Sequence, residues 1–160
     1  MTGNPDGRAF LRHTLATLAY RAGKAMRNTP PDFSGIRAGP DSRSAGEVLA
    51  HLGDLMDWAL TQAQGAQRWS DSPVQSWQTD CDRFFAALAA LDAYLATDAP
   101  LNAPAERLFQ GAVADALTHT GQLALLRRLG GSAIKPENYA KADITMGRVG
   151  SDQAAPRAEF

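Results

Sequence analysis

The chain of 160 residues is long enough for one domain with one substantial hydrophobic core. Its net charge of −1 excludes the excess of positive charge that is typical of nucleic-acid-binding domains. No stretch approaches the roughly 20 apolar residues that a transmembrane helix requires. Cys81 is the only cysteine, which excludes an intrachain disulfide and a zinc site of several thiolates. Because residues 1–8 also lack the pattern of a secretory signal, we expect a cytoplasmic protein without nucleic-acid or membrane partners.

Apolar residues recur at helical spacing in four segments, 7–27, 44–65, 72–97 and 104–130. Alanine and leucine are frequent in these segments, and both favour helix. Most of the connections are short, and no segment is rich in β-forming residues. The sequence therefore predicts an all-α protein whose fold is a four-helix bundle.

Local signals mark the ends of these helices. Ser44 and Glu47 match a capping box, in which the side chain of each residue accepts a hydrogen bond from the backbone of the other. The pair at residues 72–73, Ser-Pro, puts proline at the first position of the third helix. The fourth helix should begin near Pro104 and end at the two glycines of residues 130–131.

Residues 1–131 are assigned to the bundle, and residues 132–160 to an irregular C-terminal tail. The tail has weak periodicity, and only residues 137–143 are expected to form a short helix. We expect the tail to pack on the bundle or to be partly mobile.

Three polar residues interrupt the apolar face of the fourth helix. Asp115 and His119 are four residues apart and project from one face, and Gln122 follows three residues later. His51 lies beside the apolar stripe of the second helix, so it can meet this pair if the two helices pack together. Two imidazoles and one carboxylate are a common ligand set for a divalent cation and leave positions open for water or substrate. The alternative is a metal-free polar cluster in which Asp115 hydrogen-bonds one of the histidines.

Other residues near these positions have more than one interpretation. Asp54 lies one turn from His51; it could orient the imidazole and is the best candidate for a catalytic base, or it could lie on a solvated helix face. Gln122 could hydrogen-bond a bound cofactor, ligand or water, or satisfy the bundle core. Trp69, after the second helix, is a candidate for a pocket rim or a dimer contact. Cys81 is expected to be a buried apolar residue rather than a nucleophile.

Two helix motifs resemble those of the DinB/YfiT-like proteins. Residues 44–51 read Ser-Ala-Gly-Glu-Val-Leu-Ala-His, and the family's second helix opens with Ser-x-x-Glu and carries a histidine four residues after the glutamate. Residues 115–122 read Asp-Ala-Leu-Thr-His-Thr-Gly-Gln, with Arg127 and Arg128 further on. The family's fourth helix has His-x-x-x-His, a Gly-Gln or similar pair, and an arginine near its end. The resemblance covers residues 7–130 and leaves out the tail.

The resemblance implies a four-helix bundle, often dimeric, that holds a divalent metal ion with three histidines. It carries His51 and His119 over as ligands, whereas Asp115 stands where the family has a histidine. A carboxylate oxygen can replace an imidazole at a zinc, nickel, manganese or iron site, and it lowers the positive charge of the site and favours harder metals. The same replacement is also consistent with loss of the site.

Two functions follow as expectations. The first is a metal-dependent enzyme, a transferase that moves a small thiol to an electrophile or a hydrolase, which works as a homodimer on a small-molecule substrate. The family's thiol-dependent transferases and isomerases imply the thiol chemistry. The alternative is a non-catalytic dimeric bundle that has lost the metal site and serves as a binding or stress-associated module.

Overall fold

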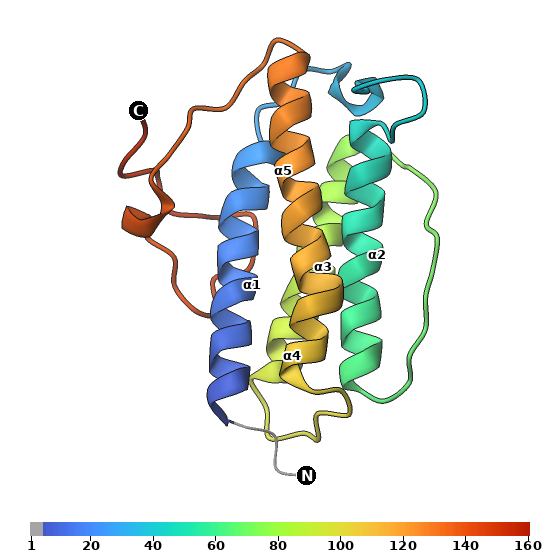
Figure 1. The fold of residues 1–160 in the computed structure, drawn as a ribbon, viewed down its shortest axis with the longest axis vertical. Helices are drawn as coiled ribbons and strands as arrows, with labels where there is room; N and C mark the ends of the chain where they lie inside the picture. Colours follow the sequence, from blue (N-terminus) through green and yellow to red (C-terminus); the bar gives the residue numbers. More distant parts are fainter. Residues whose placement is uncertain (1–4) are drawn as a thin grey trace.

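A computed structural model describes residues 5–160 and confirms the predicted all-α four-helix bundle (Figure 1). Three of the four rods are single α-helices, and the fourth is a continuous rod of three consecutive helical segments. The single helices are α1 (Pro5–Met26), α2 (Ala45–Ala63) and α3 (Trp77–Leu95), and the composite rod consists of α4 (Ala105–Leu108), the π-helical turn η2 (Phe109–Val113) and α5 (Ala114–Leu129). Apolar side chains from all four rods form one buried core.

The helices α1 and α5 run in one direction, and α2 and α3 run in the other (Figure 1). Because α2 and α3 are parallel, residues 64–76 must return along the whole length of the bundle between them. Contacts at the two ends agree with this path. The indole of Trp77 donates to Met26 O at 3.0 Å at one end, and Asn102 N donates to Ala63 O at 2.9 Å at the other.

The predicted signals at both ends of α2 and at the end of α5 are confirmed. Ser44 Oγ accepts a hydrogen bond from Glu47 N at 3.2 Å, and Glu47 Oε2 accepts one from Ser44 N at 2.6 Å, which completes the capping box. Helix α2 ends just before Gly65, and α5 ends just before two glycines. Gly65 and Gly131 have φ angles of 78° and 79°, in the left-handed region that glycine adopts without a steric penalty.

The predicted start of the third helix at residues 72–73 is wrong, because α3 begins at Trp77. Ser76 is its N-cap and accepts a hydrogen bond from the backbone of the first turn. Ser72 has another partner: its backbone N and its Oγ both donate to the Asp54 carboxylate, at 2.9 and 2.6 Å. This tertiary contact holds residue 72 in the return segment and leaves the helix to start one turn later.

The π-helical turn at residues 109–113 was not predicted. A π turn contains one residue more than an α turn, so the apolar pattern changes phase across it. A single helical repeat extended through the whole rod therefore assigns the buried positions wrongly on one side of the turn. Leu125, an apolar residue of α5, is 52 % exposed. The buried positions of α5 are Ala116, His119, Thr120, Leu123, Leu126 and Arg127.

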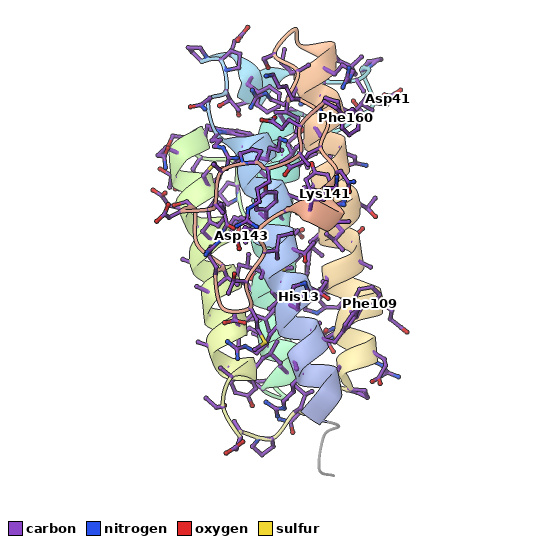
Figure 2. All side chains as sticks on the ribbon, turned by 90° about the vertical axis from the view of Figure 1, so that its left-hand side faces the viewer. His13, Asp41, Phe109, Lys141, Asp143 and Phe160 are labelled. Carbon is purple, nitrogen blue, oxygen red and sulfur yellow. The ribbon has the colours of Figure 1, made fainter. Side chains whose placement is uncertain are left out.

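The tail folds back along α1, as Figure 2 shows for the segment with Lys141 and Asp143. Its only helical turn, within the part of the chain that the structure describes, is the 3₁₀ turn η3 (Tyr139–Lys141), which is shorter than the predicted helix over 137–143. No helix among residues 5–160 is long and apolar enough to cross a membrane.

A buried charge pair fastens the tail to α1. Lys24 Nζ donates to Glu137 Oε2 at 2.8 Å, and Tyr20 donates its hydroxyl to Glu137 Oε1 at 2.6 Å. The side chains of Lys24 and Glu137 are only 5 % and 0 % exposed, and Glu159 lies 3.2 Å from the same ammonium group. Charges this deeply buried are tolerated only when each has a partner, so the tail completes the α1 surface.

We predict that Glu137→Gln lowers the free energy of unfolding by about 3 kcal/mol at neutral pH, because Lys24 loses its closest buried partner. The measurement is urea denaturation followed by circular dichroism. Asp143→Asn is the matched control in the same tail. It removes more exposed ion pairs with Arg157 and Arg148, and each such pair contributes at most about 1 kcal/mol. Equal losses in the two variants would contradict the prediction.

The difference in stability between the wild type and Glu137→Gln should depend on pH, and the pKa of Glu137 gives the direction of this dependence. Burial alone raises the pKa of the Glu137 carboxyl, but the hydrogen bonds from Lys24 and Tyr20 outweigh it and hold the pKa below its ordinary value of 4.5. A depressed pKa gives stability that is complete above the ordinary value and is lost as the pH falls through the folded value. The difference between the wild type and Glu137→Gln should therefore shrink below pH 4.5 and be constant near neutrality.

Candidate metal centre

His51, Asp115 and His119 meet where α2 and α5 pack side by side in opposite directions (Figure 1). Asp115 and His119 lie one turn apart on α5, so both side chains point toward the same neighbouring helix. His51 follows the capping box of α2 and lies on the facing side of that helix. The structure thus brings together the three residues that the sequence proposed as metal ligands.

The three side chains converge on one point. Asp115 Oδ2 lies 3.6 Å from His51 Nε2 and 3.5 Å from His119 Nε2. Three possible ligand atoms, one from each residue, lie within 4.8 Å of one another. The two imidazole side chains are 16 % and 11 % exposed and the Asp115 side chain is 48 % exposed, so solvent reaches the cluster from the Asp115 side.

This geometry is compatible with a bound metal ion. Neither approach of Asp115 to an imidazole is short enough for a good hydrogen bond. A tetrahedral ion with bonds of about 2.1 Å separates its ligand atoms by about 3.4 Å, close to both measured distances. A divalent cation can therefore be placed between the three side chains with small side-chain movements.

Gln122 holds the ring of His119. His119 Nδ1 lies 2.7 Å from Gln122 Oε1, so with the amide oxygen as acceptor the proton of the neutral ring is on Nδ1. The lone pair on Nε2 then points toward Asp115. Metal-binding histidines usually have such a partner on their second nitrogen, because it fixes the ring orientation and the tautomer. Gln122 thus contacts a candidate ligand rather than the bundle core.

The surroundings of His51 favour its neutral form. Burial lowers the pKa of its imidazole, and the charge of Arg43 and the neighbouring His119 ring lower it further, against an opposing effect of Asp115. A neutral imidazole is the form that binds a metal ion.

Aromatic rings close one side of the cluster. The return segment carries Trp69 to within 5.5 Å of the His51 ring and 5.7 Å of the Trp58 ring, edge-on in both cases. Trp69 is therefore beside the site, where the sequence suggested a pocket rim. The Trp58 Nε1 atom is buried and has no hydrogen-bond partner among residues 5–160.

Asp54 does not take the position expected for it. Its carboxylate accepts two hydrogen bonds from Ser72 and one from Arg83, at 3.1 Å from the guanidinium. The sequence left two interpretations for Asp54, an acceptor or catalytic base beside His51 or a residue on a solvated helix face. The structure shows neither, because the Asp54 side chain is 4 % exposed and is bonded to Ser72 and Arg83. The Asp54 side chain points toward α3 and the return segment, since α2 presents different faces to α3 and to α5. Its observed role is to join these three segments.

Two cavities flank the three side chains. The first, of about 360 Å³, is bordered by His119 and Gln122 and completed by Ala38, Ser42, Arg43, Val48, Leu125 and Leu126. The second, of about 400 Å³, is bordered by Asp115 and completed by Leu55, Trp58, Gln110, Gly111, Ala114 and Thr118. Both volumes are in the range of small-molecule sites. The candidate ligands therefore lie between two spaces that a substrate could occupy.

Cys81 is buried in the core, as predicted. Burial raises the pKa of its thiol to about 12, and the charges of Asp82 and Asp80 raise it further. The thiol stays protonated near neutral pH and is a poor nucleophile. Any thiol chemistry at the cluster must use a thiol that comes from outside the chain.

Sequence reasoning missed Arg43 as a residue of the first cavity. Arg43 precedes the N-cap of α2, in a loop without periodicity, so no repeat pattern connects it to His119. Its position directly before the capping box was the only available signal.

Comparisons with family models, with curated proteins and with solved structures give no match to this chain. The resemblance to the DinB/YfiT-like proteins therefore depends on the two helix motifs and the order of the helices.

Proposed function

We propose that the protein is a metal-dependent member of the DinB/YfiT-like family, in which His51, Asp115 and His119 hold a zinc, nickel, manganese or iron ion. The reaction we propose is transfer of a small thiol to an electrophile, with hydrolysis as the related possibility. The order of the four helices and the two motifs on α2 and α5 support the family assignment. The proposed assembly is a homodimer.

One observation carries this proposal. Three acceptor atoms converge at the α2–α5 contact, and the two short distances of 3.5 and 3.6 Å are spacings that ligands of one ion adopt. The Gln122 contact on His119 adds the outer partner that such a ligand needs. Convergent acceptors without a proton or cation between them repel one another, so a cation there would stabilise the arrangement.

The proposed roles follow from position. A metal ion held by three protein ligands supplies Lewis acidity and lowers the pKa of a bound thiol or water. His51 and His119 would hold it from the buried side and Asp115 from the exposed side. The Trp58 and Trp69 rings limit the access of water to one side of the cluster. Asp54 is engaged by Ser72 and Arg83, so no residue of the chain is assigned as a general base.

The alternative function is a non-catalytic bundle without a metal. The specific observation in its favour is that Asp115 lies almost equally far from both imidazoles. With one histidine protonated, Asp115 alone could compensate the charge of the cluster. The metal content of the protein distinguishes the two functions.

We predict that the protein purified without chelator contains about one divalent metal ion per chain, measured by elemental analysis. His119→Ala should lose most of it, because one of three protein ligands is removed. His13→Ala is the matched control, because His13 is exposed on α1 (Figure 2) and is not one of the three clustered residues. Metal-free wild-type protein, whose melting temperature also stays constant on addition of each of the four metals, would reject the proposal.

We predict that Gln122→Leu weakens metal binding by about 10- to 100-fold, because His119 loses the acceptor that orients its ring. The measurement is competition with a chromophoric chelator. The metal-free variant should melt close to the metal-free wild type, since Gln122 is exposed. Unchanged metal affinity would remove Gln122 from the site.

For the thiol chemistry, we predict that the zinc-loaded protein binds 2-mercaptoethanol at least about tenfold more tightly than ethylene glycol, a difference of about 1.4 kcal/mol. Isothermal titration calorimetry measures both affinities. The metal-free protein should show no such preference. Equal binding of the two compounds to the zinc-loaded protein would favour the hydrolase over the thiol transferase.

A further inference from the structure

Arg43 borders the cavity next to His119 and Gln122. Within residues 5–160, its guanidinium takes part in no ion pair and no hydrogen bond. The neighbouring Arg37 differs, because it lies 3.0 Å from Glu47 Oε2 and donates to the backbone oxygen of Ser42. Glu47 is thus occupied by Arg37 and by the capping box, which leaves Arg43 available to a ligand.

The loop that carries Arg43 is held in place by its own hydrogen bonds. Ala45 N donates to Ile36 O at 2.9 Å and closes the loop at its base. Ser42 Oγ donates to Gly39 O at 2.8 Å and accepts from Gly39 N at 3.0 Å. Because these hydrogen bonds hold the loop, Arg43 has a defined position. This reduces the conformational entropy that is lost when a ligand binds.

The rest of the cavity wall is mainly apolar. Val48 and Leu126 are buried, Leu125 is half exposed, and Ala38 lies in the closed loop. Arg43 is the only side chain with a permanent charge among the residues that line the cavity, and no acidic residue lines it. An apolar wall with one unpaired cation favours a ligand with an apolar body and one anionic group.

We propose that this cavity binds a small carboxylic acid with a short apolar chain. Arg43 pairs with the carboxylate, for which the planar guanidinium offers two parallel donors. The chain lies along Val48, Leu125 and Leu126, and the opposite end of the molecule reaches His119. The position of that end at the metal centre rests on the proposed function, whereas the pairing of the carboxylate with Arg43 requires no metal.

The experiment uses hexanoate and 1-hexanol as probes, which share the chain length and differ in charge. Binding is measured by isothermal titration calorimetry on the full chain, first after treatment with chelator and then after loading with zinc. Wild type is compared with Arg43→Gln. Arg128→Gln is the matched control, because Arg128 is also an exposed arginine near this end of the bundle but does not line the cavity. Unchanged melting temperatures establish that the variants are folded.

In the chelator-treated protein, we expect wild type and Arg128→Gln to bind hexanoate equally and Arg43→Gln to bind it at least about tenfold more weakly. Binding of 1-hexanol should be weaker than that of hexanoate and should be the same in all three proteins. Equal hexanoate affinity of wild type and Arg43→Gln, or a parallel loss of 1-hexanol, would overturn the inference.

Two further probes identify the anionic group that the cavity prefers. A measurement of metal uptake distinguishes failure of this inference from failure of the proposed function. Tighter binding of 1-hexanesulfonate or hexyl phosphate than of hexanoate would overturn the assignment to a carboxylate. Arg43-dependent hexanoate binding in a protein that takes up no metal would support the inference and reject the metal centre. Metal uptake without Arg43-dependent binding would overturn the inference alone.

Discussion

The π-helical turn at residues 109–113 determines which side chains of α5 face α2. One extra residue in this turn rotates the rest of the rod relative to α4 while the backbone remains helical. After the rotation, Ala116, His119 and Leu123 lie toward the bundle, and Asp115 lies at its edge beside His51. In a rod without the turn, the same sequence would direct a different stripe at α2, and the Asp115/His119 pair would be separated from His51. π turns occur often at functional sites, and here the turn ends directly before the helix that carries two of the three candidate ligands.

The fold was largely predictable because its helices are marked by strong local signals. The capping box at Ser44 and the glycines at 65 and 131 act within a few residues, so they can be read without knowledge of the packing. The start of α3 depends on a contact between Ser72 and Asp54, which are 18 residues apart. The π turn also has no signature of its own in the sequence. The apolar pattern therefore could not predict the long-range contact that sets the start of α3 or the change of helical phase at the π turn.

The candidate site also contains residues that helical spacing predicts and residues that it does not predict. The spacing of Asp115, His119 and Gln122 on one helix was sufficient to place them on one face. The sequence predicted that His51 meets Asp115 and His119 only on the condition that the two helices pack together, and the structure shows that they do. Asp54 takes neither of its two predicted positions, because α2 packs against two neighbouring helices and the spacing from His51 does not tell which of them Asp54 faces. Arg43 and Trp69 come from segments without periodicity. Trp69 reaches His51 only because the parallel direction of α2 and α3 sends the return segment along the bundle.

The carboxylate at position 115 is the main departure from the resemblance, and the surrounding contacts bear on its meaning. His119 Nδ1 has Gln122 Oε1 as its partner, and both imidazoles lie near one carboxylate oxygen of Asp115. This geometry is compatible with a ligand set of two imidazoles and one carboxylate. A set with one negative charge also suits a cavity that already carries the cation of Arg43, because Asp115 offsets part of the repulsion between that guanidinium and a divalent ion. The departure from three histidines and the unpaired arginine thus become parts of one electrostatic arrangement.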